Sequence, residues 1–398
     1  MLFHEEDITE QHELNSLTST LILQVMSKVF EKEGGKSMSD ESYMKLAIQL
    51  AQQTKGQTSP NPVVGAIVVK DHEVVGVGAH LKAGEAHAEV HALQMAAEKA
   101  VDATLYVTLE PCSHYGKTPP CADVVIEHDV RRVVIATTDP NPQVSGKGIN
   151  KLKEADIEVK VGVLQEEASR LNEKFFHYIR TKTPYVTLKT AVSLDGKTAT
   201  SQGDSKWITG QEARMDVHRY RHEHDAILVG IGTVLQDNPS LTTRLPDGGR
   251  NCIRIILDHH LRIPLDAQIV NDNEAPTWVV TTESVPAAKV RELENKGVRV
   301  IKLARDIISI EELLIRLGEE EITSLFVEGG ATVHGSFLTA GAFQKVITYV
   351  APKLIGGKEA PSSFLGEGIP FIDKAMSVDI QSFEKIGEDL KVVAVHKG

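Results

Sequence analysis

The chain has 398 residues and a formal net charge of −12, with 41% hydrophobic and 25% charged residues. This length predicts two domains of ordinary size, and the composition is that of a soluble globular protein. The acidic balance argues against a nucleic-acid-binding surface, and neither a signal peptide nor a membrane-spanning apolar run is found. Three cysteines are too few for a disulfide framework, so we expect a cytoplasmic protein with reduced thiols.

The first 37 residues differ in character from those that follow. An amphipathic helix fits residues 17–30, but the sequence "EGGKS" after it breaks the pattern. At Met38 a normal helix signal begins, with Ser39 or Asp40 as the N-cap of a helix over about 41–54. We therefore expect residues 1–37 to be an extension and the first domain to begin at residue 38.

The first domain is predicted to alternate strands and helices. Its strands are expected at 63–70, 73–80, 103–110, 131–140 and 157–163, and its later helices at 87–100, 121–129 and 165–180. A polar turn at Asp71 and His72 makes the first two strands a hairpin. This alternation predicts a three-layer α/β domain, which ends at the "TKTP" boundary near residue 183.

The second half, 184–398, alternates in the same way. A strand begins at residue 185, and further strands are expected at 226–230, 253–258, 277–282, 298–303, 324–330 and 345–352. Helices are expected at 210–225, 284–297 and 310–321. The pattern indicates a second α/β domain without short repeats.

Two short motifs in the first domain carry metal chemistry. The sequence "HAE" supplies His87 and Glu89, and "EPCSHYGKTPPC" supplies Cys112 and Cys121. One histidine and two cysteines are the ligands of a catalytic zinc, which leaves a fourth position for water. Glu89 lies two residues beyond His87, roughly 200° around a helix, so we expect it to move the proton of that water rather than to bind the metal.

Three alternatives remain open at this point. The two cysteines could be buried packing residues, or the zinc could be structural, with His91 or His114 as a fourth ligand. Lys117 could be a solvated charge rather than a substrate contact. The spacer of eight residues between the cysteines also departs from the two-residue spacer of the general zinc deaminase pattern.

The stretch from "SPNPVVGAIVV" through "HAEVHAL" to "TLYVTLEPCSHYGKTPPC" resembles the deaminase domain of the bifunctional riboflavin-biosynthesis deaminase–reductases. The resemblance covers about 38–183 and implies a cytidine-deaminase-like domain. It implies one Zn²⁺ per chain, held by His87, Cys112 and Cys121, with Glu89 as the proton shuttle. It also implies that the pyrimidine or its ribose phosphate contacts Asn61, His114 and Lys117.

The second domain has no G-x-G-x-x-G after its first strand, so a standard dinucleotide fold is not supported. Two glycines follow Glu328 between a strand and a helix, where backbone N–H groups can hold a cofactor phosphate; such pairs are equally common as plain turns. Arg221 and Arg244 could grip an anionic sugar phosphate bidentately, or belong to a solvated surface.

The order of these features resembles the reductase domain of the same family, which has a dihydrofolate-reductase-like fold, over 184–398. The resemblance implies an NADPH site at Ala191, Trp207, Thr233, Asp237, His259, Gly330, Ala331, Thr332, Val333, His334, Gly335 and Ser336. It implies substrate contacts at Lys189, Ser205, Arg221, Leu241, Arg244 and Glu328.

The resemblance therefore implies a two-step enzyme. Hydrolytic deamination of 2,5-diamino-6-ribosylamino-4(3H)-pyrimidinone 5′-phosphate would precede NADPH reduction of the ribosyl group to ribityl. The expected partner is this small molecule, not nucleic acid or a membrane, and a homo-oligomer is left open. The rival hypothesis is a nucleotide or nucleic-acid deaminase with an unrelated second domain.

Overall fold

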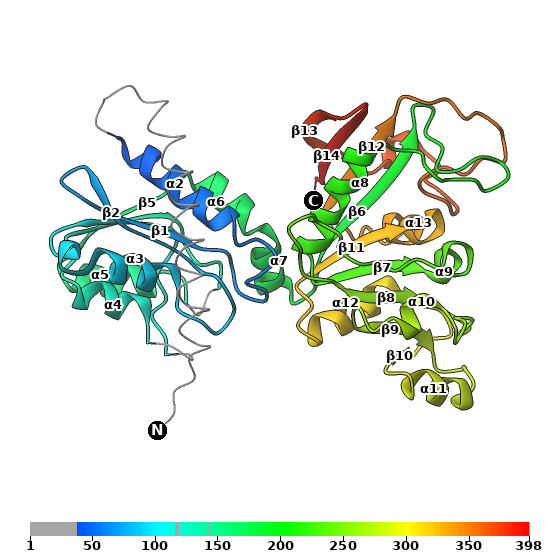
Figure 1. Ribbon diagram of the computed structural model, residues 1–398, viewed down its shortest axis with the longest axis horizontal. Coiled ribbons are helices and arrows are strands. Elements are labelled where there is room, and N and C mark those ends of the chain that lie inside the picture. Colours follow the sequence, from blue (N-terminus) through cyan, green and yellow to red (C-terminus); the bar gives the residue numbers. More distant parts are fainter. Residues whose placement is uncertain (1–37, 116–118, 142–143, 398) are drawn as a thin grey trace. The chain divides into compact units, whose positions relative to one another are not determined.

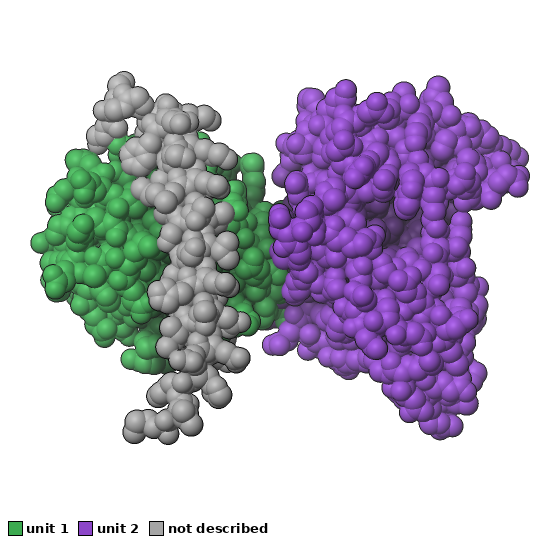
Figure 2. Space-filling view, viewed as in Figure 1, with its two compact units in different colours: residues 1–180 green, residues 181–398 purple. Residues whose placement is uncertain are grey.

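The computed structural model describes residues 38–115, 119–141 and 144–397. Two compact units divide the chain, one reaching Arg180 and the other beginning at Thr181 (Figures 1 and 2). The expected extension (1–37) and Lys117 lie outside the described residues. None of the helices that the described residues form is long and apolar enough to cross a membrane.

The first unit contains a five-stranded sheet of order β2-β1-β3-β4-β5. Its strands are β1 (Gly65–Lys70), β2 (Glu73–Ala79), β3 (Thr104–Leu109), β4 (Arg132–Thr137) and β5 (Glu158–Val161). The β1–β2 turn is where the sequence predicts it, because Asp71 and His72 both adopt the positive φ that a tight hairpin needs. Strands β3, β4 and β5 run parallel, so their carboxyl ends share one edge.

Helices cover both faces of this sheet, as Figure 1 shows. One face packs against α2 (Asp40–Gln52) and α6 (Gln165–Leu171), and the other against α3 (Ala88–Ala96), α4 (Cys121–Glu127) and α5 (Lys147–Glu154). Each face buries its own apolar cluster, which is the three-layer arrangement that the sequence predicts.

The helix predicted over 165–180 is two helices, α6 and α7 (Glu173–Thr181). Asn172, which is buried, separates them. Its side chain accepts a hydrogen bond from Val63 N and donates one to Val63 O. These two bonds satisfy the backbone N–H and C=O of Val63, and the helix is interrupted at Asn172.

The second unit is built on a nine-stranded sheet of order β10-β9-β8-β7-β11-β6-β12-β14-β13. The strands are β6 (Tyr185–Ser193), β7 (Ala226–Gly230), β8 (Ile253–Leu257), β9 (Thr277–Thr282), β10 (Arg299–Leu303), β11 (Ser324–Gly329), β12 (Lys345–Ala351), β13 (Val378–Ile386) and β14 (Asp389–His396). From β10 to β12 all neighbours are parallel, and β14 and β13 add an antiparallel edge.

Helices again lie on both faces. One apolar cluster includes residues of α8 (Gln211–Glu223), α9 (Ile231–Asp237), α10 (Gln268–Asn271) and α11 (Ala287–Glu294), and the other includes residues of α12 (Ile310–Glu319) and α13 (Ala331–Thr339). Because β8, β7, β11 and β6 are parallel neighbours, the loops after them meet at one edge of the sheet. Such an edge is where open α/β sheets bind ligands.

Candidate active sites

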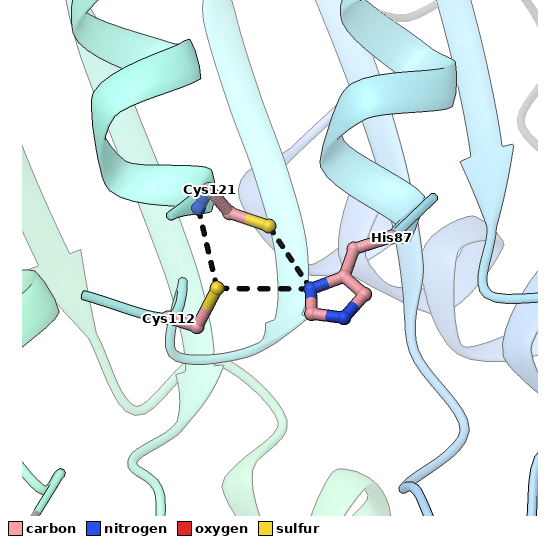
Figure 3. A group of neighbouring side chains, drawn as sticks. All are labelled: His87, Cys112 and Cys121. Atoms are coloured by element: carbon pink, nitrogen blue, oxygen red, sulfur yellow. Dashed lines mark hydrogen bonds between the residues drawn. The ribbon is translucent and has the colours of Figure 1, made fainter. Parts of the chain in front are cut away.

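Three side chains converge where the first unit's parallel strands end (Figure 3). His87 is the N-cap of α3, Cys112 lies in the loop after β3, and Cys121 is the first residue of α4. His87 Nδ1 lies 3.1 Å from Cys121 Sγ and 3.7 Å from Cys112 Sγ, and all three ligand atoms fall within 4.8 Å of one another.

This donor set fits a zinc ion. Ligand atoms bound to a tetrahedral zinc at the usual distances lie about 3.5–3.8 Å from one another, close to what these three residues show. Among the described residues the group contains these three side chains alone, and neither His91 nor His114 joins it. A closed structural site would need a fourth protein ligand, so the geometry favours a catalytic site.

The two thiols depend on each other. Hydrogen bonding from Cys121 and from His87 lowers the pKa of the Cys112 thiol to about 4, whereas the neighbouring Cys112 and burial raise the pKa of Cys121. Cys112 Sγ also accepts the backbone N–H of Cys121, at the start of α4. These surroundings favour the thiolate form of Cys112, and a metal would displace the proton of Cys121.

Glu89 lies inside the unit beside these ligands and is 3% exposed. Burial raises the pKa of Glu89 to about 7, with the nearby Cys112 charge acting in the same direction. Its Oε2 is buried and has no hydrogen-bond partner among the described residues. A buried polar atom without a partner is costly, which marks this oxygen as one that a water or substrate satisfies.

The helix expected to begin at His87 begins one residue later. His87 is extended (φ −79°, ψ 166°), and α3 begins only at Ala88, so the angle of 200° expected between His87 and Glu89 does not apply. His87 therefore precedes the helix, and Glu89 lies in the first turn of α3.

Two of the three predicted substrate residues of this unit, Asn61 and His114, lie near the His-Cys-Cys group. Asn61 Nδ2 lies 3.2 Å from Nε2 of His80, whose ring packs edge-on against that of His87 with centroids 5.1 Å apart. His114 is exposed two residues after Cys112, and its charge opposes the burial that raises the pKa of Asp139. Lys117, predicted between the cysteines, lies outside the described residues.

Glu110, which sequence reasoning missed, supports the metal loop. Its buried carboxylate accepts backbone N–H groups from Asp139, Gly146, Gly148 and Ile149. It therefore ties the loop after β4 and the start of α5 to the residue two positions before Cys112. The available signal was a charged residue at the end of an otherwise apolar strand.

A second group of charged side chains gathers in the second unit. Lys189 on β6 and Glu328 on β11 lie at neighbouring positions of paired strands, on the sheet face that α8 covers. Arg221 of α8 donates to both Glu328 oxygens (Nε–Oε1 2.5 Å, Nη2–Oε2 3.0 Å) and to Thr242 O (2.8 Å). The Nε and Nη2 groups of Arg221 thus bind a carboxylate of the protein, and the contact between Arg221 and a substrate phosphate stays a prediction.

The charges in this group are strongly coupled. Burial alone would raise the pKa of Glu328, but Arg221 and Lys189 hold it at about 2. Burial lowers the pKa of Lys189, and Arg221 adds to the effect. Arg244 is the exposed member, and the pKa of its guanidinium is lowered by burial and by Arg221. With one carboxylate facing three cations, the group suits an anionic ligand.

The remaining predicted substrate residues are Leu241 and Ser205. Leu241 is buried in the apolar cluster beneath the loop that carries Arg244, and it has a φ of +53°. Ser205 lies half-buried in the loop after β6. The structure therefore brings Lys189, Arg221 and Glu328 into one group, and places Leu241 as support for the loop.

The residues predicted to bind the cofactor lie on or after four neighbouring strands. Ala191 is on β6, Thr233 and Asp237 are on α9 after β7, and His259 follows β8. Gly330 is the N-cap of α13 after β11, and a Cβ at Gly330 would lie 3.9 Å from Thr233 Oγ1, so the starts of α9 and α13 meet. Figure 2 shows a hollow on this unit, beside the end of β11 and α13.

The loop that holds Trp207 adjoins the end of α9. Trp207 is 62% exposed, with the Arg214 guanidinium 4.6 Å from its ring centroid. Lys206 forms a 3.1 Å ion pair with Asp237. An exposed aromatic ring next to a predicted cofactor site is available for stacking.

Two members of the predicted turn from Gly330 to Ser336 face the interior instead. Both ring nitrogens of His334 lie within 3.3 Å of the carbonyl oxygens of Val327 and Ser363. A Cβ at Gly335 would lie 1.7 Å from Leu365 O. His334 and Gly335 therefore pack α13 against the rest of the unit. The other predicted cofactor residues of α13 are Ala331, Thr332, Val333 and Ser336, in its first two turns.

Comparison with known proteins assigns both units. Residues 37–137 match the family described as the cytidine and deoxycytidylate deaminase zinc-binding region, and residues 184–392 match the RibD C-terminal domain. The riboflavin biosynthesis protein RibD of Bacillus amyloliquefaciens is 53% identical over 90% of this chain and 96% of its own length. The chain belongs to the RibD family. The RibD of Aquifex aeolicus is 49% identical over 89% of this chain and 97% of its own.

Solved structures agree with this assignment. Acinetobacter baumannii RibD matches with a TM-score of 0.82 and 38% identity, over 90% of this chain and 99% of that one. A Thermotoga maritima protein matches with a TM-score of 0.79 and 40% identity, over 90% and 98%. Its name is diaminohydroxyphosphoribosylaminopyrimidine deaminase/5-amino-6-(5-phosphoribosylamino)uracil reductase.

Membership of the RibD family confirms the predicted fold class and activity. The chain is a bifunctional enzyme of riboflavin biosynthesis, with a zinc-dependent deaminase domain and an NADPH-dependent reductase domain of the RibD type. The rival hypothesis of an unrelated second domain is not favoured, because the RibD C-terminal family covers more than half of the chain.

Proposed function

We propose that the chain deaminates 2,5-diamino-6-ribosylamino-4(3H)-pyrimidinone 5′-phosphate and then reduces the ribosyl group of the product to ribityl. The observation that carries the proposal is the pairing of a His-Cys-Cys group and an unpartnered Glu89 oxygen with a separate cationic group on the second unit. The name of the Thermotoga maritima relative describes the same two reactions.

In the deaminase domain, His87, Cys112 and Cys121 would hold zinc, which supplies the Lewis acidity that activates water for attack on an aminated ring carbon. Glu89 takes the proton of that water and returns it to the departing amine. The burial of Glu89, its Oε2 without a partner among the described residues and its electrostatic interaction with Cys112 support this role. Asn61, His114 and Lys117 would orient the pyrimidine and its ribose phosphate.

In the reductase domain, NADPH would supply the hydride that reduces the anomeric carbon of the sugar. The starts of α9 and α13, with Ala191, Trp207 and His259 nearby, would hold the cofactor. Lys189 and Glu328 would lie against the sugar and Arg244 against its phosphate, with Ser205 in the facing loop. Arg221 would act through Glu328, whose carboxylate it orients.

We propose the domain bounds 38–183 for the deaminase and 184–398 for the reductase, with 1–37 as an extension. The compact units divide three residues earlier, between Arg180 and Thr181, and the family matches leave 138–183 between them. A truncation that begins at Met38 should keep both activities. Loss of folding in that variant would show that the extension is part of the first domain.

We further propose a cytoplasmic homo-oligomer. The free thiols of Cys112, Cys121 and Cys252 support a reducing compartment. Strand β13 is an edge of the sheet and exposes Val378, Ile380 and Phe383, the last by 75%. An exposed apolar edge strand favours pairing with a second copy. Sedimentation should give more than one chain per particle, and F383D should shift it toward the monomer.

The direct test of the reaction supplies the diaminopyrimidine phosphate and identifies the products by mass. Without NADPH the product should be deaminated only, and with NADPH it should also gain two hydrogens. E89Q should retain zinc and lose deaminase turnover by about 10²–10⁴-fold, while reducing an added deaminated intermediate normally. Full turnover by E89Q would refute the role assigned to Glu89.

A further inference from the structure

The loop between α9 and β8 carries two of the predicted substrate residues of the reductase, Leu241 and Arg244. Residues 238–252 form neither helix nor strand, yet they follow one face of α8. A long loop without its own secondary structure needs outside contacts to hold one conformation. The contacts that it makes with α8 are therefore informative about the site.

Two histidines of α8 supply these contacts. The backbone N–H of Arg244 donates to His218 Nδ1 at 3.3 Å, and the backbone N–H of Arg250 donates to His222 Nδ1 at 2.9 Å. His218 and His222 are four residues apart, so they share one face of the helix, a turn from each other. Both ends of the segment 244–250 are thus fixed to the same helix face.

The direction of these bonds fixes the state of both rings. A backbone N–H can only donate, so each Nδ1 must be an acceptor, and each ring is neutral with its proton on Nε2. The surroundings of His218 favour this state, because burial and the charges of Arg221 and Arg244 lower its pKa to about 4, against a smaller opposing effect of Glu328. If either histidine were protonated on Nδ1, it would lose its hydrogen bond to the loop.

The same loop is tied to the charged group of the reductase site. Arg221, which holds Glu328, also donates to Thr242 O at 2.8 Å. Nη1 of Arg244 donates to Ser240 Oγ at 2.8 Å and to Thr242 Oγ1 at 3.0 Å. These bonds leave the Nε and Nη2 donors of Arg244 without a hydrogen bond to the described residues, in the field of Arg221 and Glu328.

We propose that His218 and His222 are positioning residues, which hold the 238–252 loop so that the free donors of Arg244 face the phosphate monoester of the reductase substrate. The inference rests on the proposed contact between Arg244 and substrate. It adds two residues to the reductase site that act through backbone hydrogen bonds to the loop, and it makes phosphate recognition a property of the α8 face.

The test compares H218L, which removes the acceptor, with H218N, whose amide oxygen can take the place of Nδ1. Steady-state reduction is measured with the phosphorylated intermediate and with its dephosphorylated form. We expect H218L to raise KM for the phosphorylated substrate about three- to tenfold, the effect of one lost hydrogen bond. The kcat, the KM for NADPH and the KM for the dephosphorylated form should stay within about twofold of wild type, and H218N should restore the wild-type KM.

R244A separates this inference from the proposed function. If R244A raises KM for the phosphorylated substrate and H218L does not, the positioning role is wrong. If R244A leaves that KM unchanged, Arg244 does not bind the phosphate and the proposed contact fails. Equal losses of H218L on both substrates would show a merely structural role and would also overturn the inference. If H218L does not fold, H222L and H222N carry the same comparison.

Discussion

The two active sites of this chain are assembled in different ways. The His-Cys-Cys group proposed to bind zinc comes from two short motifs, and each of its residues lies near the end of a strand or the start of a helix. The reductase group joins Lys189, Arg221, Arg244 and Glu328 from two strands, a helix and a loop. A metal demands particular ligands at short range, whereas an anion site needs only a net charge that many arrangements provide.

This difference predicts that loss of one ligand is decisive at the zinc site. C121S should lose the bound metal and at least about a thousandfold in deaminase turnover, because the loss of zinc removes the activation of water. Metal content by mass spectrometry and ammonia release measure the two effects. NADPH oxidation with the deaminated intermediate is the matched control and should stay normal; a C121S variant with full zinc and full deamination would contradict the ligand assignment.

At the reductase site, the change expected to have the largest effect removes the Arg221–Glu328 ion pair. E328Q leaves the Arg221 and Lys189 charges without their buried partner and should lower the free energy of unfolding by about 3–5 kcal/mol. Both tryptophans of the chain, Trp207 and Trp278, belong to this unit, so tryptophan fluorescence in denaturant reports its unfolding. E319Q, in an exposed pair with Arg316, is the control and should change stability by less than about 1 kcal/mol. Equal effects of the two variants would show that the buried pair is not special.

The same carboxylate predicts the acid sensitivity of the reductase unit. Because the pKa of Glu328 is about 2 in the folded chain and near 4.5 otherwise, its contribution is complete above pH 4.5 and lost as pH falls through 2. The change amounts to roughly 3 kcal/mol. His218, with a pKa of about 4, acts in the same direction between pH 6.5 and 4, because unfolding lets it take up a proton. Tryptophan-monitored stability should fall across these ranges in wild type, and less steeply below pH 4.5 in E328Q.

A smaller effect is expected from Gly148, which packs against the loop that carries Cys112. A Cβ at Gly148 of α5 would lie 2.0 Å from Pro111 O, the residue before Cys112. G148A should therefore displace the loop and weaken zinc binding by about tenfold or more, as measured by competition with a chelator. G232A, in α9 with open space around it, is the matched control and should be tolerated. Unchanged zinc affinity in G148A would show that the loop is held by other contacts.

Local pattern predicted most parallel strands, and ligand chemistry singled out His87, Cys112 and Cys121, whose ligand atoms the structure places within 4.8 Å of one another. Sequence reasoning missed Glu110, His80 and His218, whose partners are backbone or side-chain atoms of distant segments. Helix α5 was missed because it buries only Gly148, Ile149 and Leu152 in a lysine-rich stretch. Strand β13 was missed because it is exposed on both faces and so lacks the alternation of a half-buried strand.

Arg221 shows most clearly why the reductase site could not be derived in full. Its residue type suggested a phosphate grip, but its partner is Glu328, 107 positions away in the chain, and only the pairing of the fold brings the two together. The same is true of the α8 histidines, whose neutral state follows from bonds to a loop without secondary structure.

One chain is proposed to catalyse two successive reactions, deamination of the substrate and reduction of the deaminated product. To test this, a mixture of the E89Q and K189A variants is supplied with the diaminopyrimidine phosphate, zinc and NADPH, and the products are identified by mass. E89Q alone should not deaminate the substrate, and K189A alone should form the deaminated product without reducing it. The mixture should yield the deaminated, ribityl-containing product. Failure of the mixture to form that product, while each variant retains its intact activity, would contradict the account.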